Sequence, residues 1–414
     1  MDKDTTKSTF KEYLLPFSSE FLLKQIDALN LDKYVKKLDS ATFSKLMIFA
    51  QLTHIGSLAD ISLVLRTCEE LQQELELESI SASQLSRKLR DLDPHLYELS
   101  LNHIIQQVQR EYGFQKGTEA LGRLNLIDSS TISLCLTRYR WAEFRNTKSG
   151  IKMHTRIIYH DGAVSPDKVI LKPAKAADKT EMDELVVQEP DALNLFDRGY
   201  LDYELFDQYC ANGTRFVTRL KSNAIVTVIE EKPVDPRGPI LREAIVLLGK
   251  PGVNQMKHPV RLIETQDSEG NLIIIVTNDM NLETAEIGDV YRYRWQIELF
   301  FKWVKQHLHI KRFYGISANA VYNQIRIALI TYCLLLLLQR RVAYHGKLLM
   351  LFKLVQRCWG EPLTVMIRKL HGNRTRASKG RRTYDHERIF AETLQQFETG
   401  EADHLNDLAY DPVN

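Results

Sequence analysis

The chain has 414 residues, of which 44% are hydrophobic and 26% are charged, and its net charge is +2. These values are typical of a soluble globular protein with two or three domains, and they exclude low-complexity and uniformly basic proteins. Any surface for nucleic acid must therefore come from local clusters of cations. The five cysteines form no CxxC pair, which indicates a reducing compartment and no structural zinc.

Residues 1–120 show apolar positions at helical spacing and few strand signals. The clearest helix begins with a capping box at Ser81 and Gln84, after which three leucines line one face. Its basic residues, Arg87, Lys88 and Arg90, point elsewhere. Two interpretations stay open: a bundle helix with a solvated face, or a helix that enters the major groove of DNA.

Residues 121–221 change to alternating strands and helices, which indicates an α/β sheet with some parallel pairs. Asp128 lies in the first apolar run, and Asp197 follows a short buried one. The predicted strands cover 124–132, 152–159, 168–171, 192–196 and 214–220, and the predicted helices cover 179–187 and 202–210.

Residues 222–271 are punctuated by proline and glycine, with β-like runs at 224–230 and 244–247. This pattern predicts a small β-rich insertion in the larger sheet. The strongly apolar run 272–277 then returns to the core as a strand.

The segment YRYRWQIELFFKWVK, residues 291–305, reads as one helix with a narrow polar strip. The strip carries one acid, Glu298, together with the phenol of Tyr291 and the three cations Arg294, Lys302 and Lys305. Such strips are usually solvated faces with i,i+4 ion pairs. Here apolar residues cover most of the remaining helix, which favours a site for a metal ion and a polyanion.

Three carboxylates can thus come from separate elements: Asp128 and Asp197 from strands, and Glu298 from a helix. Unpaired carboxylates are costly to bury, so their presence in buried elements points to a purpose. If the three converge, they can hold a pair of divalent cations that activate a hydroxyl and stabilise a leaving phosphodiester oxygen. Hard oxygen ligands favour Mg²⁺ or Mn²⁺ over Zn²⁺.

At these residues the chain resembles the DDE transposases of bacterial insertion sequences, in the branch named after insertion sequence four. That branch has a Tyr, Arg, Glu and Lys signature, which Tyr291, Arg294, Glu298 and Lys305 match at the same spacings. The motifs IDSS around Asp128 and LFDRGY around Asp197 precede it in the expected order. The resemblance covers residues 121–345.

The resemblance implies an RNase H-like catalytic core, with Asp128, Asp197 and Glu298 as the catalytic triad that binds two Mg²⁺ ions, replaceable by Mn²⁺. It implies that Tyr291, Arg294 and Lys305 bind DNA phosphates. The expected domains are a helical N-terminal DNA-binding domain (1–120), the first part of the core (121–221), a β-rich insertion (222–271), the second part of the core (272–345) and a C-terminal helical and basic region (346–414).

The implied reaction is cleavage at transposon ends followed by strand transfer into target DNA. The expected partner is double-stranded DNA, both terminal inverted repeats and target, bound by a homodimer in the bacterial cytoplasm at the nucleoid, with no membrane. A family member can place a Trp in the insertion for hairpin formation, yet no Trp lies between Trp141 and Trp295, so Tyr or Phe would have to substitute. The alternative function is a sequence-specific DNA-binding repressor or structural protein whose nuclease centre is idle.

The last third begins with an apolar run, 327–338, that is too short to span a bilayer and reads as part of a buried helix over 320–340. A further helix is expected at 347–359. The run RTRASKGRR, residues 374–382, holds five cations and is either a solvated loop or a contact to the DNA backbone.

Overall fold

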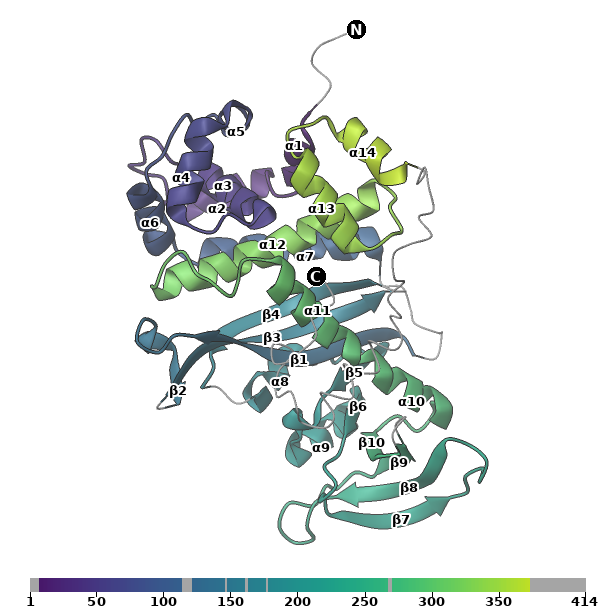
Figure 1. Ribbon diagram of the computed structural model, residues 1–414. Coiled ribbons are helices and arrows are strands. Elements are labelled where there is room, and N and C mark those ends of the chain that lie inside the picture. The colour runs from purple at the N-terminus through teal and green to yellow at the C-terminus, as the bar shows by residue number, and fades with distance from the viewer. Residues whose placement is uncertain are drawn as a thin grey trace.

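The structure is a computed structural model, and it describes residues 7–113, 121–145, 147–160, 163–175, 178–266 and 270–372. Helices gather at one end of the molecule, and one mixed sheet forms the other part (Figure 1). The predicted mixed α/β class is therefore confirmed. The basic run 374–382 lies outside the described residues.

The N-terminal region is helical, as its periodicity predicts. Its helices are α1 (Thr9–Leu14), α2 (Glu20–Ala28), α3 (Ser40–Thr53), α4 (Leu58–Thr67), α5 (Glu69–Leu75), α6 (Ala82–Asp91) and α7 (His95–Tyr112). The predicted capping box opens α6, since the Ser81 hydroxyl accepts from the Gln84 N–H and the Gln84 side chain accepts from the Ser81 N–H. Leu85 and Leu89 form the buried face of α6, and both side chains are fully buried.

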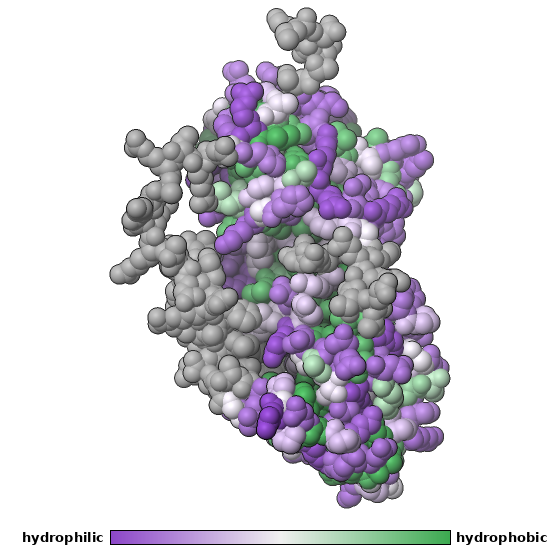
Figure 2. Space-filling model, turned by 90° about the vertical axis from the view of Figure 1, so that its right-hand side faces the viewer, coloured by the Kyte–Doolittle hydropathy of each residue, from purple (hydrophilic) through white to green (hydrophobic). Residues whose placement is uncertain are grey.

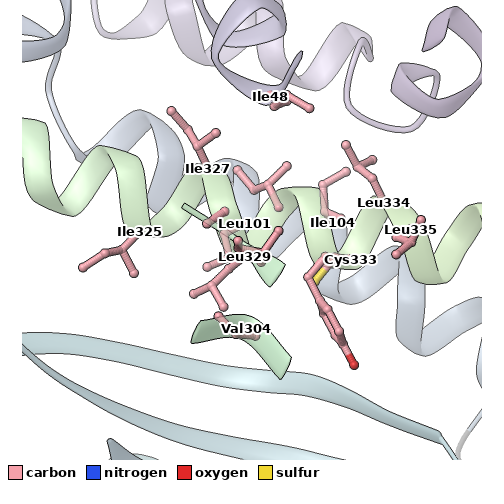
Figure 3. Close-up of a cluster of buried hydrophobic side chains, with 14 of the residues drawn as sticks. Ile48, Leu101, Ile104, Val304, Ile325, Ile327, Leu329, Cys333, Leu334 and Leu335 are labelled. Carbon is pink, nitrogen blue, oxygen red and sulfur yellow. The ribbon is translucent and has the colours of Figure 1, made fainter. Parts of the chain in front are cut away.

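One long helix, α12 (Ala318–Arg341), organises the helical part. Side chains from α3, α7 and α11 (Trp295–His307) surround it, as Ile48, Leu101 and Val304 show in Figure 3. The phenol of Tyr13 in α1 also donates to the Thr331 carbonyl at 2.6 Å. By length and composition α12 could cross a membrane, but 89% of its most apolar window is buried in the protein, which fits the predicted buried helix.

The described strands form one sheet in the order β2-β3-β1-β5-β6-β10-β9-β8-β7, with β4 also paired to β3. Strands β1, β5 and β6 run parallel to one another, whereas β3 is antiparallel to both β1 and β4. The strands are β1 (Arg123–Leu134), β2 (Glu143–Arg145), β3 (Lys148–His160), β4 (Ala163–Pro173), β5 (Ala192–Phe196), β6 (Arg215–Arg219), β7 (Val226–Lys232), β8 (Ile240–Leu248), β9 (Val260–Gln266) and β10 (Leu272–Thr277).

The remaining helices connect or cover the sheet. They are α8 (Met182–Leu185), α9 (Tyr203–Asn212), α10 (Thr284–Tyr293), α13 (Leu348–Cys358) and α14 (Leu363–His371). Helices α7 and α12 lie between the upper helices and the sheet (Figure 1), and the Tyr332 phenol of α12 donates to the Val164 carbonyl of β4. On the face in Figure 2, apolar residues appear in small areas among hydrophilic ones.

In three places the structure differs from the predicted elements or adds to them. The expected helix over 179–187 shortens to a 3₁₀ turn and α8, because the chain becomes extended from Val186 onward. Strand β9 had no prediction, although its residues VRLIETQ are apolar at the start. Strands β7 to β9, from the segment predicted to be a β-rich insertion, extend the main sheet through β10.

Candidate active site

Asp128 and Asp197 occupy corresponding positions on neighbouring parallel strands. The last paired residues of β1 and β5 are Ile127 and Phe196, so each aspartate is the next residue along its own strand direction. The Asp128 carboxylate accepts from the Ser129 N–H at 2.7 Å, and the Asp197 carboxylate accepts from the Arg198 N–H at 2.6 Å. Parallel pairing, which the sequence predicted, therefore brings these two acids to the same place on the sheet.

Glu298 reaches this place from the first turn of α11, a helix that packs on β1. The helix predicted over 291–305 is wrong as a single helix, because α10 ends at Tyr293 and α11 starts at Trp295. The joint is Arg294, which keeps a right-handed helical conformation. The carboxylate of Glu298 is 5% exposed.

The guanidinium of Arg294 bridges two of the three acids. Its Nη2 lies 2.7 Å from Oε1 of Glu298, and its Nη1 lies 3.6 Å from Oδ2 of Asp128. The Arg294 side chain is 13% exposed, and the Tyr291 ring lies with its centroid 5.7 Å from the guanidinium carbon. Three residues of the predicted polar strip therefore lie in contact around one guanidinium: Tyr291, Arg294 and Glu298.

Burial and neighbouring charges raise the pKa of Asp128 and of Glu298. Burial is the main cause that raises the pKa of Asp128 to about 8, and the charges of Glu298 and Asp197 raise it further against the opposing effect of Arg294. Burial likewise raises the pKa of Glu298, again against Arg294.

The donor chemistry of these acids fits a divalent cation. Three carboxylates supply hard oxygen ligands, and Oε2 of Glu298 is buried without a hydrogen-bond partner among the described residues. In the arrangement shown, however, no three His, Cys, Asp or Glu side chains of the described residues are grouped so that they could hold a metal ion. In this arrangement the guanidinium of Arg294 is the partner of the Asp128 and Glu298 carboxylates.

Lys305 takes a different place from the other signature residues. Its side chain is buried, at 5% exposed, and its ammonium donates to the Thr131 carbonyl of β1 at 3.0 Å. Lys305 therefore binds the same strand that carries Asp128. No feature of the sequence indicated this backbone contact, and the predicted phosphate-binding role of Lys305 stays a prediction.

Arg219 joins the site although sequence reasoning did not select it. Phe196 of β5 pairs with Thr218 of β6, so Arg219 follows Asp197 in the same row of the sheet. Burial raises the pKa of Tyr291 above its ordinary value. The charges of Arg294 and Arg219 oppose this rise without cancelling it. The available signal was an arginine directly after the strand-like run FVT.

The start of α10 is tied to the outer strands by a buried ion pair. The Arg261 guanidinium of β9 lies 2.7 Å from a Glu243 oxygen of β8 and donates to the Thr284 hydroxyl and to the Leu282 carbonyl. Glu243 also accepts from Thr284 at 2.7 Å. Strands β8 and β9 thereby hold the helix that leads to Tyr291 and Arg294.

Comparison with known proteins gives two family matches. A family model described as a transposase DDE domain matches residues 119–334, which include all three acids. A second model, described as a domain of unknown function (DUF4372), matches residues 5–75.

Individual proteins also resemble the chain. A Sinorhizobium fredii protein named as a transposase, y4zB, is 31% identical over 251 residues, or 59% of this chain and 68% of that protein. A Geobacillus stearothermophilus protein named as a transposase for insertion sequence element IS5377 is 27% identical over 59% of this chain and 63% of that protein. A solved structure of the piggyBac transposase synaptic complex with hairpin DNA is 10% identical, covers 99% of this chain and 87% of that chain, and has a TM-score of 0.48.

Proposed function

The chain belongs to the family of transposases with a DDE domain, and on that premise we propose that it cleaves DNA at the ends of a mobile element and joins them to target DNA. The observation that carries the proposal is the placement of Asp128 and Asp197 on neighbouring parallel strands opposite Glu298. Acids from separate elements that face one another in a half-buried site suit phosphodiester chemistry.

The site would hold two divalent cations, either Mg²⁺ or Mn²⁺, through the carboxylates of Asp128, Asp197 and Glu298. Those cations, when bound, would supply Lewis-acid activation of a water or a 3′-hydroxyl and stabilise the leaving oxygen. The burial that raises the pKa of Asp128 and the unpaired Oε2 of Glu298 support this role, because a bound cation would stabilise buried carboxylates that lack a full set of partners. The acids act as ligands, so the reaction needs no side chain as nucleophile.

Arg294 would exchange its partners during the reaction. To serve as ligands, Asp128 and Glu298 must be released by the guanidinium that now bridges them. A DNA phosphate is a suitable replacement, because it accepts two parallel hydrogen bonds from an arginine. The Nε of Arg294 is buried without a hydrogen-bond partner among the described residues. Its N–H group is therefore available to donate to such a phosphate.

Neighbouring groups would complete the phosphate site. Tyr291 lies against Arg294, and we assign it to the same phosphate. Arg219, from the row that carries Asp197, supplies a second guanidinium. Lys305, held on β1 through Thr131, adds positive charge next to Asp128 and can reach a phosphate by leaving that carbonyl.

The wider assignments follow from the same premise. We infer an RNase H-like core built on β1, β3, β4, β5 and β6, which the mixed pairing of these strands supports. We infer that strands β7 to β9 are an insertion in that core, and that the N-terminal helices bind DNA. The partner would be double-stranded DNA, with a homodimer holding two paired ends.

The test is an excision assay on matched inverted repeats with Mg²⁺ present, using Asp128→Ala, Asp197→Ala and Glu298→Gln. We expect each variant to lose strand cleavage, while Glu204→Gln, which changes an exposed acid on α9, keeps it. Full cleavage by any of the three variants would refute the triad. A native chain that binds the ends without cutting them would favour a repressor or structural role.

A further inference from the structure

The loop between α2 and α3 presents an exposed group of cations around an aromatic ring. Lys33, Lys36 and Lys37 are exposed, and Tyr34 between them is 86% exposed. The ammonium of Lys33 lies 5.6 Å from the centre of the Tyr34 ring. No ion pair joins these three lysines to a carboxylate within the described part of the chain. Exposed cations interleaved with an aromatic side chain are typical of nucleic-acid surfaces.

This loop has a fixed place. The carboxylate of Asp32 accepts from the Ser40 N–H at 2.8 Å, from the Ser40 hydroxyl at 2.8 Å and from the Lys88 ammonium at 2.8 Å. At the other end of the loop, Lys37 donates to the Ser79 hydroxyl at 3.3 Å. The lysines therefore stand beside α6 and the turn before it.

The outer face of α6 continues the same surface. Arg87 is exposed next to Lys88, and Ser83 and Ser86 are exposed on the same helix. Arg90 is engaged by Asp91, with Nε 2.7 Å from Oδ1. Four cations, Lys33, Lys36, Lys37 and Arg87, thus face solvent here.

Few acids oppose these cations. Asp39 caps α3, where it accepts from the Thr42 N–H at 2.7 Å, and Glu78 is exposed before Ser79. Glu76 is also exposed, whereas Asp32 and Asp91 are paired with Lys88 and Arg90. The four exposed cations still outnumber the three exposed acids, in a chain whose overall charge is close to zero. Local excess of this kind is what an electrostatic contact to a polyanion requires.

The surface is also rigidly joined to the catalytic part. Asn319 of α12 donates to the Arg90 carbonyl at 3.1 Å, and Asn323 donates to the Leu92 carbonyl at 2.9 Å. The same helix α12 packs against α11, which carries Glu298 (Figure 1). A DNA duplex bound at α6 would therefore keep a defined position relative to the acids.

We propose that Lys33, Lys36, Lys37 and Arg87 bind the phosphate backbone of duplex DNA, with Tyr34 packed against the same strand. The proposal rests on the proposed function for its partner. It assigns the contact to backbone rather than base recognition, because lysine ammonium groups on a loop neutralise phosphates without reading base edges. The region matched by the domain of unknown function thereby receives a sequence-independent DNA-holding role.

The test is the salt dependence of binding of the full chain to a fluorescent 30-base-pair duplex, measured by anisotropy in EDTA so that no cleavage occurs. Each lost phosphate contact lowers the slope of log affinity against log salt by about 0.9, so Lys33→Gln, Lys36→Gln and Lys37→Gln together should lower it by roughly 2.7. The fall should be the same for a duplex that contains an element end and for one that does not.

Two further variants make the outcome decisive. Changing the same three lysines to arginine keeps the charge and should keep the native slope. The matched control, Lys11→Gln with Lys347→Gln and Lys353→Gln, removes three exposed charges from the α1 and α13 region and should leave the slope unchanged. An unchanged slope in the loop variant, or an equal fall in the control, would overturn the proposal. Cleavage measured separately with Mg²⁺ reports on the triad, so failure of one proposal is distinguishable from failure of the other.

Discussion

Arg294 and Glu298, one helical turn apart, form a buried ion pair with 2.7 Å between Nη2 and Oε1. The same guanidinium faces Asp128, so the proposed metal ligands share an internal cation. An internal cation and a bound metal ion would compete for the same carboxylates.

The first prediction follows from this competition. Arg294→Gln should raise the affinity of the DNA-free protein for Mn²⁺ by about tenfold, equivalent to about 1.4 kcal/mol. The same variant should bind end DNA more weakly, because it lacks the guanidinium fork. Calorimetric titration with Mn²⁺ and anisotropy with end DNA would measure the two effects. Arg292→Gln removes a side chain that is 81% exposed and should change neither, so equal effects in both variants would contradict the prediction.

The second prediction concerns pH. The pKa of Asp128 is about 8 in the folded protein and about 4 in an unfolded chain, so the folded state binds the extra proton between these values. The free energy of unfolding of the metal-free protein should therefore fall as pH rises from about 4 to 8 because of this group. Asp128→Asn should remove that contribution, which urea unfolding at several pH values would measure. Parallel pH profiles for the native and variant chains would contradict it.

The third prediction concerns the ion pair that holds α10. Glu243→Gln leaves the Arg261 guanidinium, 6% exposed, without its counter-charge, and should lower the free energy of unfolding by about 3–5 kcal/mol. The control Glu231→Gln breaks a pair in which Glu231 is 54% exposed to screening solvent, and should lower the free energy of unfolding far less. Chemical denaturation of both variants makes the comparison, and similar losses in the two would argue against the buried pair.

The fourth prediction concerns packing around α12. Leu329 is fully buried among α3, α7 and α11 (Figure 3), so Leu329→Ala should cost about 2–5 kcal/mol through lost contacts and a cavity. Leu241→Ala, at a side chain that is 48% exposed, should stay within about 0.5 kcal/mol. Thermal unfolding would rank the two, and a tolerant Leu329→Ala would show that the helix repacks freely.

Much of the site could be predicted because its signals are local. A carboxylate in or directly after a buried strand is visible in a single segment, as Asp128 within β1 and Asp197 after β5 show, and parallel pairing then brings the two together. The capping box of α6 is equally local, since Ser81 and Gln84 satisfy each other's backbone.

The remaining features depend on contacts between distant segments. Arg219 enters the row of acids only through the register of β5 and β6, which a single sequence does not reveal. The ammonium of Lys305 meets the Thr131 carbonyl across 174 positions of sequence. The break at Arg294 lacks a proline or glycine, so no local breaker announces it.

The long helix α12 has a consequence for how such a chain can change over generations. Its faces are covered partly by α3 and α7 from the first 113 residues and partly by α11 and β4 from the sheet region. A recombination event that replaced residues 7–113 with an unrelated segment would leave Ile327, Leu334 and Leu335 facing water. The shared cover of α12 therefore makes residues 7–113 and the sheet region one packing unit, in which an exchange of either part would expose apolar side chains of the other.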